Sequence, residues 1–358
     1  TWKLADERNR AQLEADKATQ VSEFLAGLFQ VSDPGQSRGE TITARELLSR
    51  GADKIQTELK DQPEVRASMM VQVAEVYQSL GLYRDAKALF EQALTIQRKV
   101  LGKEHVELAR ALNGLGETHR SLGEYEEAEP LLRESLAMSR KLVGNMHPDV
   151  AAAADALGWL LNDLGDLAAA EPLYREAFNI WMNQPGDMRP EVGLALNNLA
   201  LLLHEKSEYP AADSLFRRAL EIQRQVLGDV HPEIATTLVN LGQLLRDMSR
   251  LDEAERMLRE ALSIDRKLYG EENITVAHSL NSLALLLQEK GEYNKARGLF
   301  EEALSIRRTL LGEVHTDVAA SLSALARLYH DQGRLDTAET MMRQVLEMKQ
   351  QIYGSKHH

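Results

Sequence analysis

Histidine, the commonest metal ligand in proteins, recurs in this sequence at intervals of 42 residues or a multiple of 42, at His105, His147, His231, His315 and His357. Packed helices of successive units lie about 10 Å apart, whereas a zinc ion needs its ligand atoms within about 2.1 Å. One histidine per unit cannot chelate a metal. We therefore expect no metal site, and a structural role for these histidines near the start of a helix.

Other residues that could do catalysis are equally dispersed. The remaining candidate bases fall in separate segments of the sequence, at His119, His204, His278 and His330. Carboxylates lie in stretches rich in Glu and Arg, where solvated ion pairs between residues four apart are the ordinary arrangement. There is no nucleophile elbow, no dinucleotide fingerprint and no cysteine. We expect a protein that is not an enzyme and needs no cofactor.

The charge balance bears on the class of partner. The chain has 55 acidic and 42 basic residues, a formal net charge of −13. A protein that binds nucleic acid through its phosphates needs a basic face, so we expect no nucleic-acid partner. No apolar run reaches the roughly 18 residues that span a bilayer, and no signal peptide is visible. We expect a cytoplasmic protein, or an extracytoplasmic one if a membrane helix precedes Thr1, with membrane contact only through such an upstream segment.

A repeat with a period of 42 residues organises the chain. One position is alanine in seven consecutive copies, at Ala86, Ala128, Ala170, Ala212, Ala254, Ala296 and Ala338. A glycine recurs with the same period at Gly102, Gly144, Gly186, Gly228, Gly270, Gly312 and Gly354. Such a period is typical of a solenoid, in which each unit buries its apolar face only by stacking on its neighbours. Few aromatic residues and many Ala, Leu and Glu predict an all-α fold with one continuous core.

Each unit reads as two antiparallel helices, called here helix A and helix B. Helix A has a second small position, at Ala74, Gly116, Gly158, Ala200, Gly242, Ala284 and Ala326, which allows close approach to helix B. The turn between the helices contains glycine in five units but Ser207 and Ser249 in two. We expect these serines either to adopt the left-handed conformation that glycine favours or to use another turn.

The repeats do not fill the whole chain. We expect residues 1–62 to form capping helices, 63–354 to form seven repeats, and 355–358 to be the start of a truncated repeat or a tag remnant. Within the cap, Thr43 and Glu46 have the spacing of a capping box, so a helix should begin there. An apolar stripe in the preceding helix should pack against it, formed by Val21, Leu25, Leu28 and Phe29.

These positions together resemble the tetratricopeptide repeat (TPR). The period of 42 residues, with Leu-Gly-x-x-His-Pro before helix A as at 227–232, is similar to the kinesin-light-chain type in bacteria. The resemblance covers residues 64–354 and implies a right-handed superhelical solenoid. Pro185-Gly186 replaces Leu-Gly, and Arg189 and Asn273 replace the loop histidine, so those loops could differ. Residues 18–59 resemble the segment before the TPR array of bacterial serine/threonine kinases, although the chain contains no kinase signature.

In a TPR superhelix, helix A lines the inner groove. The positions near its small residue give a predicted peptide-binding groove of Arg110, Asn113, Arg120, Trp159, Asn162, Asn197, Asn198, Leu201, Asn240, Gln243, Arg246, Asn281, Gln288, Arg327 and His330. Asparagine is a poor helix former, but its amide both donates and accepts, so a row of asparagines could hold a peptide backbone. Alternatively, these asparagines are solvated or bond to the neighbouring helix. The lysines of the TPR clamp for C-terminal carboxylates are missing from these positions.

The sequence therefore favours a non-catalytic scaffold that binds a partner protein or an extended peptide. The resemblance includes bacterial proteins associated with tubulin-like filaments, so a filament subunit is one candidate partner. The alternative is the regulatory region of a membrane-bound serine/threonine kinase, which native sequence upstream of Thr1 would reveal.

Overall fold

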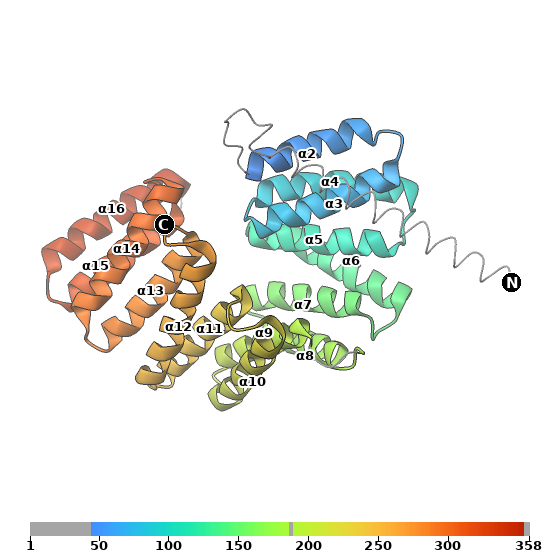
Figure 1. The fold of residues 1–358 in the computed structure, drawn as a ribbon. Helices are drawn as coiled ribbons and strands as arrows, with labels where there is room; N and C mark the ends of the chain where they lie inside the picture. Colours follow the sequence, from blue (N-terminus) through green and yellow to red (C-terminus); the bar gives the residue numbers. More distant parts are fainter. Residues whose placement is uncertain (1–43, 186–188, 354–358) are drawn as a thin grey trace. The chain divides into compact units, whose positions relative to one another are not determined.

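The computed structural model describes residues 44–185 and 189–353. Every regular element in these two ranges is an α-helix, which confirms the predicted all-α solenoid. The helices group into two compact units that divide between Gln184 and Pro185 (Figure 1). The boundary coincides with the loop in which Pro-Gly replaces Leu-Gly, and the single continuous core that the repetition predicts stays a prediction.

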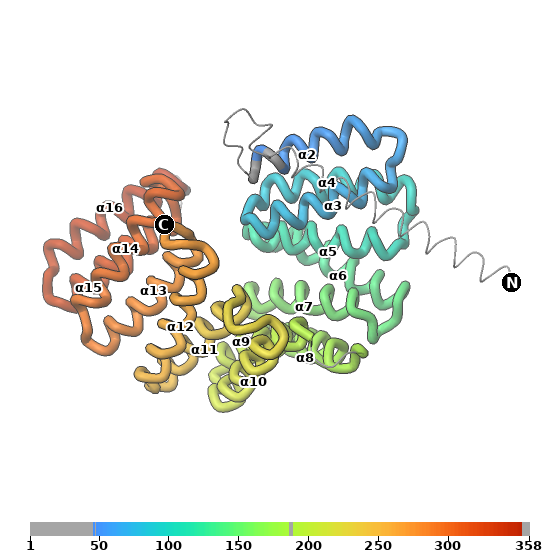
Figure 2. The backbone as a smooth tube through the Cα atoms, in the orientation of Figure 1, coloured from blue at the N-terminus to red at the C-terminus, as the bar shows by residue number. Residues whose placement is uncertain are grey.

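The first unit contains a leading helix and three helix pairs. These are α2 (Ala44–Glu58), α3 (Pro63–Ser79) with α4 (Tyr83–Val100), α5 (Val106–Ser121) with α6 (Tyr125–Val143), and α7 (Pro148–Asp163) with α8 (Leu167–Met182). Each helix B contacts its own helix A, α4 and α6 also contact the helix A of the next pair, and α3, α5 and α7 contact one another in succession (Figure 2). The A helices α3, α5 and α7 therefore share one face of the unit.

The second unit repeats this arrangement in four pairs. They are α9 (Pro190–Glu205) with α10 (Tyr209–Leu227), α11 (Pro232–Asp247) with α12 (Leu251–Tyr269), α13 (Ile274–Glu289) with α14 (Tyr293–Leu311), and α15 (Thr316–Asp331) with α16 (Leu335–Tyr353). Here too α9, α11, α13 and α15 contact each other in succession. None of the helices in the described ranges has the apolar length that crossing a bilayer requires.

Small residues set the distance between the helices of a pair. The recurring alanine of helix B is fully buried in the first six copies and 6% exposed at Ala338. In helix A, Gly158 lies so close to Tyr174 that an added Cβ would be 2.9 Å from the ring. A larger residue would push the helices apart, so these small residues are a packing requirement.

The recurring loop histidine caps helix A. Its Nδ1 accepts a hydrogen bond from the backbone N–H two residues later, at 3.2, 3.1, 3.3 and 3.1 Å for His105, His147, His231 and His315. Asn273 accepts in the same way through its side-chain oxygen, whereas Arg189 makes no side-chain cap. Because the first turn of a helix leaves N–H groups without partners, the predicted structural role is confirmed. His357 lies outside the described residues.

Left-handed backbone closes the turn between helix A and helix B in the units with serine as well as in those with glycine. The φ angle is 61° at Ser207 and 58° at Ser249, close to the 76° of Gly123. Of the two outcomes predicted for these serines, the structure therefore shows the left-handed conformation and not another turn. A residue with a Cβ is strained by about 1 kcal/mol in this region.

The N-terminal predictions are only partly within the described residues. Helix α2 begins at Ala44 and buries Leu48 and Ile55. The apolar stripe of residues 21–29, the cap at Thr43 and residues 355–358 lie outside the described ranges. The role of residues 1–62 as a cap therefore stays a prediction.

Candidate functional site

In the first unit, the predicted groove residues belong to α5 and α7, and their charged members bind neighbouring carboxylates. Arg110 donates from Nε to Asp149 at 3.1 Å. Arg120 donates to Asp163 on the next helix A at 2.8 Å, and its guanidinium lies 5.5 Å from the centre of the Trp159 ring. Trp159 is half-buried, and Asn113 and Asn162 on the same helices are half-buried too. The arginines are thus already engaged within the protein.

Two carboxylates on this face have unusual protonation behaviour. Burial raises the pKa of Glu117 to about 7, an effect that Arg120 opposes and Glu75 strengthens. Burial also raises the pKa of Glu75, against the opposing charge of Arg110. Glu75 and Glu117 occupy the same repeat position as the predicted Trp159, 84 and 42 residues before it, respectively. That equivalence is the sequence signal by which they could have been found.

In the second unit, the asparagines bond to one another. Asn197 and Asn198 on α9 are 3% and 2% exposed. Asn240 on α11 donates to the Oδ1 of Asn197 at 3.0 Å, and Asn197 lies 3.4 Å from the Oδ1 of Asn198. This geometry matches the alternative in which asparagines bond to the neighbouring helix. Leu201 and Gln243, on the same two helices, are half-buried.

A regular set of contacts joins the ends of successive A helices in this unit. His204 Nε2 lies 2.8 Å from an oxygen of Asp247, and Gln288 donates to Asp331 at 2.5 Å. Arg246 donates to Asp247 at 3.0 Å and lies 3.8 Å from Glu289. Each contact joins residues 43 positions apart, apart from the Arg246–Asp247 pair. The predicted groove residues Arg246 and Gln288 therefore hold neighbouring A helices together.

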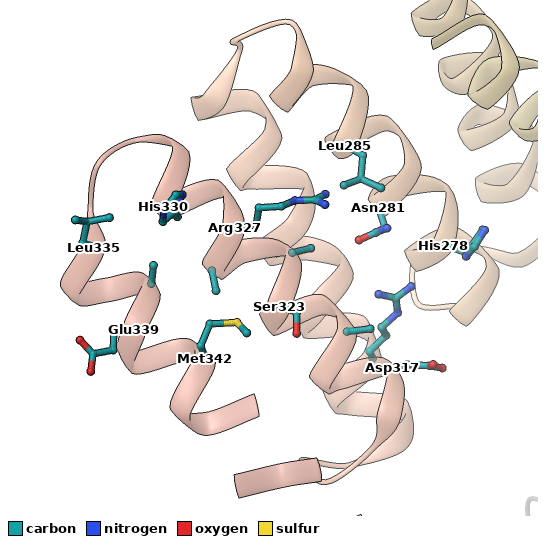
Figure 3. A pocket seen from close by; sticks show the side chains of 15 residues that line it. His278, Asn281, Leu285, Asp317, Ser323, Arg327, His330, Leu335, Glu339 and Met342 are labelled. Carbon is teal, nitrogen blue, oxygen red and sulfur yellow. The ribbon is translucent and has the colours of Figure 1, made fainter. Parts of the chain in front are cut away.

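The remaining predicted residues of the second unit, Asn281, Arg327 and His330, line one hollow of about 1010 Å³. The hollow is formed by α13, α15 and α16, with Arg307 contributed by α14. Figure 3 shows His278 and Asp317 at one end and Leu335 and Met342 at the other, with Asn281, Ser323 and Arg327 between them. His278 and Asp317 thus make one end of the hollow polar, whereas at the other end the apolar side chains of Leu335 and Met342 lie beside the carboxylate of Glu339.

Charges in the hollow differ in whether they have partners. Glu339 accepts from Arg343 at 2.7 Å. By contrast, Arg327 and Arg307 form no ion pair with any carboxylate in residues 44–185 and 189–353. At the polar end, burial and the charge of Arg307 lower the pKa of His278, while Asp317 opposes them.

Sequence reasoning missed several residues of this hollow. Leu285 stands 42 residues after Gln243 and 42 before Arg327, both of which were predicted. Arg307 comes from helix B, whereas all of the predicted groove residues come from helix A. No cluster of three or more His, Cys, Asp or Glu side chains suited to a metal occurs in the part of the chain that the structure describes.

Comparison with protein families gives a match over most of the sequence. The profile of the family described as Tetratricopeptide repeat matches residues 65–141, 121–183, 191–267 and 275–351. A comparison with curated proteins gives no match.

Solved structures with the same architecture include three of particular interest. BtubC (BKLC) from P. vanneervenii has 22% identity and a TM-score of 0.54, covering 67% of this chain and 94% of its own. The Rap conjugation gene regulator of the plasmid pLS20, in complex with the Phr* peptide, has 15% identity and a TM-score of 0.63, covering 95% and 98%. A Rap protein complexed with Competence and Sporulation Factor has 11% identity and a TM-score of 0.65, covering 94% and 98%. At these identities, the similarity concerns the fold.

Proposed function

The chain belongs to the tetratricopeptide repeat family, whose fold is a scaffold for protein interactions, and from this premise we propose that it is a non-catalytic adaptor that binds an extended segment of a partner protein. The proposed site is the helix A face of the second unit. It includes the hollow lined by Asn281, Arg327 and His330.

The observation that carries the proposal is the hollow itself. Its volume of about 1010 Å³ is large enough for several side chains. Asn281 offers a donor and an acceptor for a peptide backbone. Leu285 beside it, and Met342 at the other end of the hollow, offer apolar surface. Convergent polar groups beside apolar walls are the usual composition of a binding site.

The bonds between A helices refine which predicted residues would touch the partner. Asn197, Asn198 and Gln288 are buried and belong to the contacts between helices. The predicted residues with accessible surface in this unit are Leu201, Asn240, Gln243, Arg246, Asn281, Arg327 and His330. We assign binding to this second group, in which Asn240 and Arg246 also join neighbouring A helices, and a positioning role alone to the buried residues. In the first unit, the predicted groove residues Trp159, Arg110, Asn113, Arg120 and Asn162 would form a binding surface of that unit.

Structures of the same fold support a peptide ligand. One similar Rap regulator was solved with the Phr* peptide, and another Rap protein was solved with Competence and Sporulation Factor. A second candidate partner is a filament subunit of the tubulin-like kind, suggested by the resemblance of the repeats to bacterial kinesin-light-chain-like proteins and by the similarity of fold to BtubC (BKLC). The alternative role, regulation of a membrane-bound serine/threonine kinase, predicts a kinase domain in the native sequence upstream of Thr1.

A photo-crosslinking experiment tests the site. A benzophenone amino acid at Ala324, inside the hollow, should crosslink to a partner protein in cells of the source organism. The matched control at Ser305, which is exposed on α14, should not. Mass spectrometry of the crosslinked peptide then identifies the segment bound. Crosslinks from position 305 alone would place binding on the helix B face and reject the proposed site.

Affinity measurements with the identified segment test individual residues. Asn281→Ala should weaken binding by about 1 to 3 kcal/mol through lost backbone hydrogen bonds. The helix B variant Ser305→Ala should leave the affinity unchanged. If the two variants bind equally well, Asn281 does not contact the partner.

A further inference from the structure

Arg307 is a buried guanidinium without a carboxylate partner. Its side chain is 7% exposed, and it lines the hollow between α13, α15 and α16. One terminal nitrogen donates to the hydroxyl oxygen of Ser321, while Nε is buried without a hydrogen-bond partner. No carboxylate of the described residues forms an ion pair with it. A charge buried in this way is unfavourable unless an opposite charge reaches it.

The repeat itself does not require a charge at this position. The equivalent residues in other units include Gln97, Ser139 and Gln223, all buried. In the preceding unit, Asp265 takes the place of Arg307 and accepts from Ser279 at 2.6 Å. Smaller, neutral side chains are therefore buried at this repeat position in other units. The positive charge of Arg307 serves something other than packing.

The surroundings of Arg307 leave room for an anion from outside. Asp317 is close enough to raise the pKa of Arg307, although burial lowers it by more, and the two form no ion pair. The hydroxyl of Ser321 donates to the backbone oxygen of Asp317 at 3.1 Å. Ser321 therefore accepts a hydrogen bond from Arg307 but supplies no negative charge to balance the guanidinium.

The hollow also offers apolar surface away from Arg307. His278 and Asp317, the groups electrostatically coupled to Arg307, lie at one end, whereas Leu335 and Met342 lie at the other (Figure 3). Met342 is 49% exposed, while Phe300, the equivalent residue one unit earlier, is fully buried. Methionine adapts its shape to different apolar groups. A ligand that fills the hollow would thus meet the positive charge of Arg307 on one side, and on the other the apolar side chains of Leu335 and Met342 beside Glu339, which is paired with Arg343.

We propose that Arg307 binds an Asp or Glu side chain of the partner segment, with an aliphatic or aromatic side chain of the same segment packed on Met342. This inference rests on the proposed function and names the chemistry of the partner. Arg307 would hold the carboxylate by charge-assisted hydrogen bonds. Arg327, also without an ion pair in the described residues, would attract the same acidic segment.

Selection of peptides against the intact protein tests this assignment. A display library of random 12-residue peptides should yield binders that contain Asp or Glu together with a large apolar residue. By fluorescence anisotropy, Arg307→Gln should weaken a selected peptide about tenfold or more. Arg308→Gln, which removes the same charge from the next residue of α14, should change affinity by less than about twofold. Gln at position 307 matches Gln97 and Gln223, and thermal unfolding verifies that the variant folds.

The peptide provides the other half of the cycle. Changing the acidic residue of the peptide to its amide, Asp to Asn or Glu to Gln, should weaken binding to the unmodified protein. The same change should not further weaken binding to the Arg307→Gln variant. Equal losses for both proteins would overturn the assignment. A second outcome would also overturn it: selected peptides that lack acidic residues and are displaced by millimolar acetate. That result would indicate a site for free anions.

The results also separate this inference from the proposed function. Peptides that depend on Asn281 but not on Arg307 would reject only the carboxylate site. A library that yields no binder at all would reject peptide binding itself, and the carboxylate site with it.

Discussion

The side-chain amide of Asn240 donates a hydrogen bond of 3.0 Å to the Oδ1 of Asn197, which stands one unit earlier on the neighbouring helix A. Asn197 is 3% exposed, so its oxygen has little access to water. Part of the asparagine row thus joins the A helices to each other. These asparagines therefore fix the A helices relative to one another, in addition to lining the predicted groove with hydrogen-bonding groups.

Replacing Asn240 tests this positioning role. Asn240→Ala leaves a buried acceptor without its donor, which should lower the free energy of unfolding by about 1 to 3 kcal/mol. Urea denaturation measures the change. Gln243→Ala, on the same helix and also half-buried, is the control and should lose less. Equal stability of the two variants would mean that the bond to Asn197 contributes nothing.

The histidine caps give a second prediction. His231→Ala removes the side chain that accepts from the N–H of Glu233 and should cost about 1 kcal/mol of stability. His231→Asn should retain most of it, because Asn273 caps α13 in the same way. Thermal unfolding of the three proteins distinguishes the cases. An asparagine variant as unstable as the alanine variant would contradict the capping role.

The serine turns can be improved. Ser249→Gly should raise the free energy of unfolding by roughly 0.5 to 1 kcal/mol, because glycine adopts a φ angle near 58° without strain. Ser305→Gly, at an exposed position inside α14, should instead lower it by a similar amount. The denaturation midpoint should therefore rise in the Ser249→Gly variant and fall in the Ser305→Gly variant, relative to the unmodified protein.

The packing of helix A on helix B predicts a large difference between adjacent alanines. Ala212 is fully buried, whereas Ala211 is exposed on the same turn of α10. Ala212→Leu should overpack the pair and cost about 1 to 3 kcal/mol. Ala211→Leu should have little effect. A tolerated leucine at position 212 would show that the constant alanine is not a packing requirement.

Protonation of Glu117 should make stability depend on pH. Because burial raises its pKa from the ordinary 4.5 to about 7, the folded chain holds a proton that the unfolded chain releases at lower pH. The favourable contribution is complete below about pH 4.5 and is lost as the pH rises through 7. Over that range, the free energy of unfolding of the unmodified protein should fall by roughly 1 to 3 kcal/mol relative to that of the Glu117→Gln variant. The exposed Glu127→Gln serves as control, and its denaturation profile should follow that of the parent.

The repeated residues account for how much of the fold could be predicted. Alanine and glycine at a period of 42 residues predicted the paired helices, the small contact positions and the family, because each unit meets the same steric demand. The spacing of the loop histidines also predicted their position at the start of helix A. The division into two units was not among the predictions, since the 42-residue repeat continues through residues 185–186 with only a local substitution.

The candidate site shows the opposite balance. The sequence by itself placed Asn281, Arg327 and His330 on one face, because a helical period assigns faces without knowledge of neighbours. Only the tertiary structure decided that Asn197 and Gln288 are buried between helices, and that Arg307 of a helix B reaches the same hollow. Burial and hydrogen-bond partners depend on side chains brought together from different units, and the repeat pattern of a single unit does not contain that information.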